Sequence, residues 1–142
     1  MSRRREYLDL LARVPLFAQC GRAELKALDT HAAFRSVGVG YDLVREGDPG
    51  EELFILVDGT ARVNRGGAVV DTLGPGDFFG ELALLDPAPR NATVTATSEL
   101  DVLVIGRAEF ESVLGKAPGL TRSLLAGMAR RLRVHERGTA ES

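Results

Sequence analysis

The sequence predicts an α+β fold, mainly β, in which helices flank an antiparallel β-roll of jelly-roll type. Glycines punctuate residues 33–106 at short intervals, between runs rich in Val, Ile, Phe and Thr. Strands about ten residues apart with turn residues between them are typical of antiparallel sandwiches and barrels. Before residue 33 and after residue 106 the apolar residues recur at helical spacing instead. A chain of 142 residues has room for one domain with a substantial core.

Residues 1–32 form the first predicted segment and are expected to be helical. Apolar side chains recur at helical spacing over residues 3–14, until Pro15 interrupts the pattern. A second helix is expected at about residues 22–32, with Leu25, Leu28 and His31 on one side. We therefore expect two short helices ahead of the first strand.

The β-roll is predicted over residues 33–106. Its clearest strands are five short runs: Glu52–Val57, Thr60–Asn64, Ala68–Leu73, Ala92–Thr97 and Asp101–Ile105. Gly66 and Gly67 lie between two of these runs, and glycine accepts the positive φ angles that a tight hairpin turn requires. The second and third runs are therefore predicted to pair as a hairpin.

Residues 107–137 are predicted to be helical again, with a break at Pro118–Gly119 and a long helix after it. On a helical wheel one arc of that helix is apolar and consists of Leu120, Leu124, Leu125, Met128 and Leu132. The opposite side carries Arg122, Arg130, Arg133 and Arg137, which we expect to be solvated or to face a partner. Residues 138–142 have the composition of a linker and are expected to form a tail.

Composition excludes several function classes. The net charge of −2 offers no overall electrostatic attraction for nucleic acid. Cys20 is the one cysteine, which rules out an intrachain disulfide and fits a reducing compartment. With no long apolar run and no signal-peptide pattern, we expect a cytoplasmic protein that is not inserted in a membrane.

A jelly roll can also be a metal-binding enzyme of the cupin type, and the sequence argues against this class. Such sites need two or three histidines on neighbouring strands, whereas this chain has only His31 and His135, both in segments expected to be helical. Cys20 has no histidine base near it in the sequence, and no nucleophile–base pair emerges. We therefore predict no metal site and no catalytic site.

The strongest motif lies in residues 76–94, where a glycine turn, a carboxylate and an arginine nine residues beyond the carboxylate occur together. Gly80 predicts a tight turn into a short helix, whose first N–H groups form an anion site. Arg90 adds a guanidinium fork that matches two phosphate oxygens. Glu81 repels an anion, so its expected partner is a hydroxyl donor. The motif therefore predicts a small anionic ligand that also carries a hydroxyl group.

This segment closely resembles the phosphate-binding cassette of cyclic-nucleotide-binding domains, the type found in catabolite activator protein and protein kinase A regulatory subunits. The resemblance covers about residues 5–137, and Arg45–Leu56 followed by Gly59 is similar to the family's early strand pair. It implies that Glu81 binds the ribose 2′-hydroxyl and that Arg90 binds the cyclic phosphate. The remaining ligand-binding positions that it implies, largely through backbone amides, are Gly80, Leu82, Ala83, Asn91 and Ala92.

Two positions depart from the family pattern. Glu51 stands where the family often has an aspartate that steadies the arginine from behind, so Glu51 is the expected supporting residue. Asn91 stands where Ala, Ser or Thr is more usual, and threonine there tends to accompany a preference for cGMP. We expect cAMP as the ligand, with cGMP as the alternative, and no other cofactor.

The resemblance also implies that the last helix folds over the base. Arg131 projects into the apolar arc and His135 lies near it, so Arg131, Leu132 or His135 is expected to cap the purine. The alternative for Arg131 is that its stem covers the edge of the core while its charge reaches water.

The predicted function is a sensor module that binds cyclic nucleotide and moves its C-terminal helix, and it is not an enzyme. Only about five residues follow that helix, too few for the helix-turn-helix of family transcription factors, so no DNA contact is expected. The output would pass through a partner protein, through self-association or through further domains of a longer protein. The competing hypotheses are an interaction domain whose pocket is empty or repurposed and a small cupin-like enzyme. Oligomeric state and effector stay open.

Overall fold

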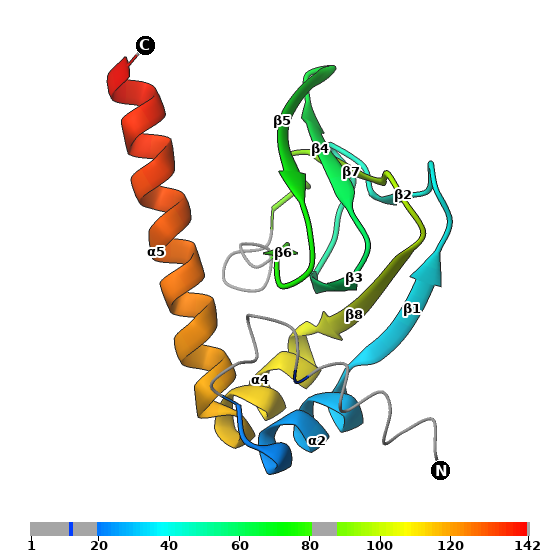
Figure 1. The fold of residues 1–142 in the computed structure, drawn as a ribbon, viewed down its shortest axis with the longest axis vertical. Helices are drawn as coiled ribbons and strands as arrows, with labels where there is room; N and C mark the ends of the chain where they lie inside the picture. Colours follow the sequence, from blue (N-terminus) through cyan, green and yellow to red (C-terminus); the bar gives the residue numbers. More distant parts are fainter. Residues whose placement is uncertain (1–11, 13–19, 81–87, 142) are drawn as a thin grey trace.

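The computed structural model describes Ala12, residues 20–80 and residues 88–141, with side chains for all of these except Leu114 and residues 131–141. Within these ranges the fold is mainly β with flanking helices, which confirms the predicted fold class (Figure 1). The predictions for residues 1–11, 13–19 and 81–87 lie outside the described residues.

Two antiparallel four-stranded sheets form the roll. The first has the order β1 (Ala33–Val37), β8 (Leu100–Gly106), β3 (Glu52–Asp58) and β6 (Phe78–Phe79). The second has the order β2 (Asp42–Val44), β7 (Thr93–Ala96), β4 (Ala61–Arg65) and β5 (Ala68–Leu73). Each of the five predicted strands is present, with its ends within two residues of the prediction. β1, β2 and β6 were not among them, because these short strands show little alternation of apolar and polar residues.

The predicted hairpin turn between β4 and β5 is confirmed. Gly66 and Gly67 have φ angles of 60° and 85°, and two successive positive φ angles define the turn type whose twist matches that of paired strands. The pairing it sets places Arg65 opposite Ala68 and Ala61 opposite Leu73.

The core has two parts, and β3 lies between them. Leu53, Ile55 and Val57 belong to the cluster that the helices cover, whereas Phe54 and Leu56 belong to the cluster inside the roll. Successive side chains of a strand point to opposite faces, so a strand buried on both faces must be apolar throughout. This is the physical reason for the unbroken apolar run 53–57 in the sequence.

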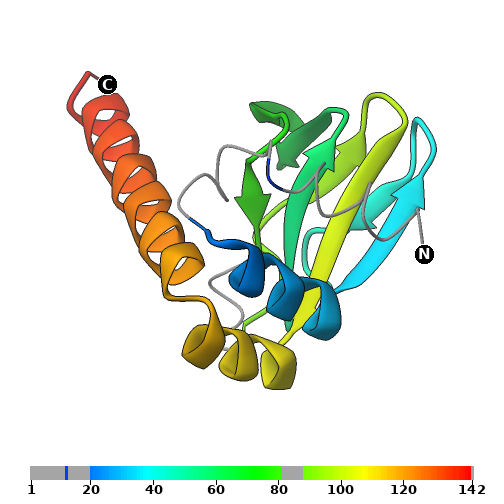
Figure 2. The same ribbon diagram turned by 60° about the horizontal axis from the view of Figure 1, so that its bottom comes forward.

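Three helices are described: α2 (Arg22–His31), α4 (Arg107–Lys116) and α5 (Pro118–Glu141). α2 and α4 lie side by side across one end of the roll, and α5 runs up the flank on which β6 lies (Figures 1 and 2). Pro118 begins α5, where its missing N–H costs nothing, so the predicted break falls between α4 and α5. α5 continues to Glu141, and residues 138–141 are therefore helical and not a tail.

Only part of the predicted apolar arc of α5 is buried. Leu120 and Leu124 are buried and Met128 packs against the core, but Leu125 is 61% exposed. Leu125 lies on the predicted arc but outside its buried part, because the side of the helix that faces the core carries Leu120, Leu124, Gly127 and Met128, and Leu125 lies 100° around the helix axis from Leu124. Among the described helices none is long and apolar enough to cross a membrane.

Candidate functional site

Arg90 stands in the segment that leads into β7, and the loop between β2 and β3 fixes its backbone. The Arg90 N–H donates to the carbonyl of Asp48 at 2.8 Å, and the N–H of Gly47 donates to the carbonyl of Arg90 at 2.8 Å. The side chain is buried, with 8% of its surface exposed. Two segments more than 40 residues apart in the sequence are thus joined at this arginine.

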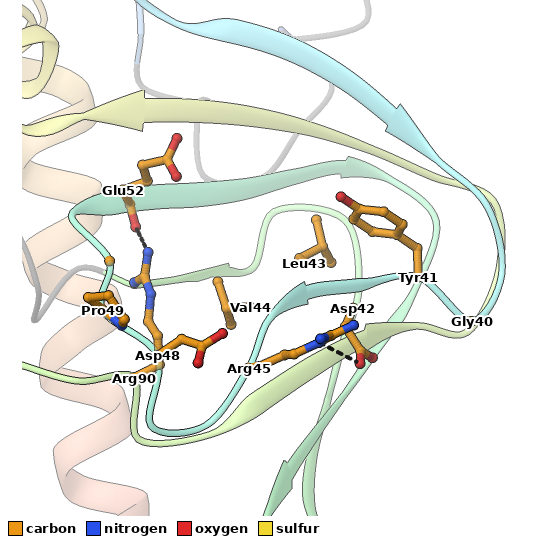
Figure 3. A pocket seen from close by; sticks show the side chains of 11 residues that line it. Gly40, Tyr41, Asp42, Leu43, Val44, Arg45, Asp48, Pro49, Glu52 and Arg90 are labelled. Atoms are coloured by element: carbon orange, nitrogen blue, oxygen red, sulfur yellow. Dashed lines mark hydrogen bonds and ion pairs between the residues drawn. The ribbon is translucent and has the colours of Figure 1, made fainter.

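The Arg90 guanidinium has a defined place within this frame. Its Nη2 donates to the carbonyl of Glu52 at 3.1 Å, and the side chain extends from its loop toward the start of β3 (Figure 3). Its Cζ lies 5.8 Å from the ring centroid of Phe54, which in turn stacks on Phe79 at 4.8 Å. These contacts leave the cation in one orientation, over an aromatic pair.

One atom of that guanidinium has no acceptor among the described residues. Arg90 Nη1 is buried and finds no hydrogen-bond partner there. A buried polar group without a partner is costly, and a charged one more so. The position therefore suits an anionic ligand that supplies the acceptor.

Burial lowers the pKa of the Arg90 guanidinium from its ordinary value, and the negative charge of Glu52 opposes part of this shift. An arginine side chain still keeps its proton at neutral pH. The site therefore holds a partly desolvated positive charge. An anion stabilises such a charge more strongly than it stabilises an arginine that is exposed to water.

Two glycines let the guanidinium lie against bare backbone. Gly80 has φ +89°, and a Cβ there would clash with the carbonyl of Glu52 and come within 2.8 Å of Arg90 Nη1. A Cβ at Gly50 would clash with Arg90 Nε. Gly80 has the positive φ angle that the predicted tight turn needs, and the turn itself stays a prediction because residues 81–87 lie outside the described residues. The role of Gly50 was missed, although its place within the family-like segment 45–56 was a signal that could have found it.

An open groove of about 470 Å³ borders this arginine. β2 and the loop after it supply most of its lining, together with Glu52 and Arg90 (Figure 3). Its wall is mixed: Leu43 and Val44 are apolar, while Asp42 and Arg45 form an ion pair at 3.5 Å. The volume is within the range of small-molecule sites.

Other predicted ligand-binding positions fall beside Arg90 or outside the described part of the chain. Asn91 is exposed, and its carbonyl accepts a hydrogen bond from Arg65 Nε at 3.1 Å. Ala92 is buried. Glu81, Leu82 and Ala83 lie outside the described residues, so their contacts to the ligand stay predictions.

The supporting and capping residues also stay predictions. Glu51 is exposed, and the guanidinium donates a hydrogen bond to the backbone carbonyl of the next residue, Glu52. Arg131, Leu132 and His135 belong to α5, but their side chains lie outside the described ones.

Sequence reasoning missed the residues that tie the rim of the site together. Glu46 accepts a hydrogen bond from the N–H of Gly66 at 2.9 Å, and its own N–H donates to Thr93 Oγ1 at 2.9 Å. Arg65 holds Asn91 from the same hairpin. Glu46 lies within the family-like segment 45–56, but no sequence pattern gives its partners or those of Arg65, because each acts through a contact between distant segments.

Among the described residues, Cys20 packs against the core cluster that the helices cover and His31 belongs to α2. Burial, followed by the charge of Glu24 and a hydrogen bond to Glu24, raises the pKa of the Cys20 thiol to about 11. His31 lies against Lys116, with Nε2 and Nζ 3.4 Å apart. Within the described ranges no three potential metal ligands come together.

Comparison with known proteins identifies the family to which this chain is similar. The model of the cyclic nucleotide-binding domain matches residues 34–117. A cAMP-dependent protein kinase regulatory subunit from Hypocrea atroviridis is 37% identical over 121 residues, which is 85% of this chain and 26% of that protein. The chain thus spans about a quarter of the length of this relative.

Solved structures of two similar proteins have the same fold. The catabolite activator protein of Thermus thermophilus is 29% identical and superimposes with a TM-score of 0.79, over 89% of this chain and 62% of that one. The regulatory domain of Toxoplasma gondii PKA with cAMP is 26% identical, with a TM-score of 0.74, over 92% of this chain and 51% of that one. The two-sheet roll, the buried arginine beside Gly80 and the family match together show that the chain belongs to the cyclic nucleotide-binding domain family.

Proposed function

We propose that this chain is a regulatory module that binds a cyclic nucleotide, with cAMP preferred to cGMP. The observation that carries the proposal is Arg90: its guanidinium is buried and held in one orientation, and its Nη1 has no acceptor among the described residues. A phosphodiester supplies an acceptor and one negative charge together.

The neighbouring backbone suits the same ligand. Gly80, whose absent side chain leaves room beside Arg90 Nη1, begins the segment that carries Glu81. In our proposal the cyclic phosphate binds Arg90 and the N–H groups of the cassette, and Glu81 accepts a hydrogen bond from the ribose 2′-hydroxyl. A 2′-deoxy ligand would leave that carboxylate without its donor and bind less tightly.

Two of the similar proteins support the assignment of a cyclic-nucleotide-binding role. The fungal relative is a regulatory subunit of a cAMP-dependent kinase, and the Toxoplasma gondii domain was solved with cAMP. Domains of this kind bind and regulate, so we assign this chain a binding role and not a catalytic one. We also propose a cytoplasmic location, in keeping with its single cysteine.

The output of the module is proposed to be a change in the position of α5. A ligand shifts a conformational equilibrium by as much as its affinities for the two states differ. Arg131, Leu132 or His135 would contact the base and supply that difference. The recipient of the movement is a protein effector, a second copy of the chain or a further domain.

Calorimetric titration of cAMP and cGMP into the purified protein tests the proposal. Wild type is expected to bind saturably, and Arg90→Gln is expected to lose about 2–5 kcal/mol, which weakens Kd by roughly 30-fold to several thousand-fold. Arg62→Gln is the matched control, because Arg62 is an exposed arginine on β4. Absence of binding by folded wild type at high concentration would contradict the proposal and favour an interaction domain with an empty or repurposed pocket.

A further inference from the structure

α5 packs against the roll through a glycine. Gly127 is buried in the middle of the helix, where glycine is less favourable than alanine. A Cβ at this position would lie 2.7 Å from Cε1 and 3.0 Å from Cζ of Phe78. Distances this short leave no room for a methyl group, so the ring of Phe78 occupies the place that a side chain at residue 127 would take.

Phe78 cannot easily make room by turning away. It is 3% exposed and belongs to the core cluster that the helices cover, and its backbone pairs with Ile55 of β3. A buried aromatic ring in a close-packed core transmits a displacement to its neighbours. A methyl group at residue 127 would therefore move α5.

The base of α5 is held separately. The N–H of Gly119, in the first turn, donates to Glu24 Oε2 of α2 at 3.0 Å, and Ala117 just before the helix is fully buried. A helix fixed at its first turn and pushed outward at Gly127 would pivot about its base.

The same short strand reaches the phosphate site. β6 consists of Phe78 and Phe79, whose rings enter different core clusters. Phe79 stacks on Phe54, over which the Arg90 guanidinium lies. β6 thus carries one ring to α5 and the next ring to the aromatic pair beneath Arg90, immediately before Gly80.

We propose that the contact between Gly127 and Phe78 sets the position of α5 and couples that position to the phosphate site through β6. Gly127 and Phe78 are positioning residues in this account and do not touch the ligand. The coupling part rests on the proposed function. Because coupling between two sites is reciprocal, a change that moves α5 must also change nucleotide affinity.

The first test measures the position of α5 without any nucleotide. Spin labels are placed at Val69 on β5 and Arg130 on α5, both exposed, with Cys20→Ser as background. Gly127→Ala is expected to shift the distance distribution. Gly115→Ala is the matched control, since Gly115 is an exposed glycine of α4 with open space where its Cβ would be. Equal distributions for the two variants and wild type would overturn the proposal.

The second test measures cAMP affinity of the same variants by calorimetry. Gly127→Ala is expected to change Kd by about fivefold or more, in line with typical coupling between sites, and Gly115→Ala by much less. A rise in affinity would show that the ligand-bound state does without the contact, and a fall that it keeps the contact. A Kd within about twofold of wild type for both would overturn the coupling.

Repair variants separate this contact from general destabilisation. Phe78→Leu removes the ring atoms that a methyl group at residue 127 would meet, so Phe78→Leu with Gly127→Ala is expected to return distance and Kd toward wild type. Circular dichroism checks that each variant folds. If Gly127→Ala does not fold, Phe78→Leu alone tests the contact. Failure of wild type to bind nucleotide would count against the proposed function, while the distance test would still decide the position of α5.

Discussion

At the scale of single residues, Arg90 shows how a charge is prepared for a ligand. Backbone pairing with Gly47 and Asp48 places its Cα, and the carbonyl of Glu52 and the face of Phe54 orient its guanidinium. A group oriented before binding loses little conformational entropy when the ligand arrives. The burial that lowers the pKa of Arg90 would also strengthen the attraction of the guanidinium for the phosphate of the proposed ligand.

Gly50 gives a prediction at this scale. A methyl group there would clash with Arg90 Nε, so Gly50→Ala is expected to displace the guanidinium and weaken cAMP binding by about tenfold or more, at an overpacking cost of roughly 1–3 kcal/mol. Calorimetry and urea unfolding measure the two effects. Gly38→Ala is the control, because Gly38 has open space at its Cβ position. Equal affinity for both variants would refute a role for Gly50.

At the scale of elements, the part of α5 whose side chains are described contacts the core through Leu120, Leu124, Gly127 and Met128. Leu120 and Leu124 are buried, Met128 packs at the edge, and Leu125 projects to solvent. The rotation of α5 about its own axis therefore decides which of its apolar side chains are buried.

The different burial of Leu124 and Leu125 predicts unequal effects of replacing these neighbouring leucines. Leu124→Ala is expected to lower the free energy of unfolding by about 2–5 kcal/mol, because it leaves a cavity in the core. Leu125→Ala is expected to change it by less than about 0.5 kcal/mol, because the side chain is already exposed. Urea denaturation of both variants measures the two changes in the free energy of unfolding. Similar losses would mean that α5 packs in a different rotation.

At the scale of the whole molecule, the site exists only when distant parts of the chain have come together. The loop between β2 and β3, Gly80 and the segment at Arg90 meet around one guanidinium. An unfolded chain has no such arrangement, so a ligand of this site binds the folded state alone.

Binding should therefore stabilise the fold. At a free cAMP concentration 100 times Kd the free energy of unfolding is expected to rise by about 2.7 kcal/mol. Denaturant titration with and without cAMP measures this, with Arg62→Gln behaving as wild type and Arg90→Gln showing little increase. An equal increase in Arg90→Gln would place the ligand elsewhere on the protein.

Several features of this protein were determined by the sequence itself. Gly66 and Gly67 required a tight hairpin, and the apolar run at residues 53–57 required a buried strand. Gly80 favoured the positive φ angle that it has, and the spacing of nine residues between Glu81 and Arg90 carried the family resemblance. These features are predictable because each depends on the backbone preferences or the pattern of a few neighbouring residues.

Only the tertiary structure decided the contacts between segments. The carbonyl of Glu52 lies 38 residues from Arg90, and Phe78 and Gly127 belong to different elements altogether. The exposure of Leu125 depended on the rotation of α5 against the core. The formation of the short strands β1, β2 and β6 depended on pairing with strands far along the chain. No local pattern encodes these choices, because their free energy comes from packing between elements whose placement only the whole fold determines.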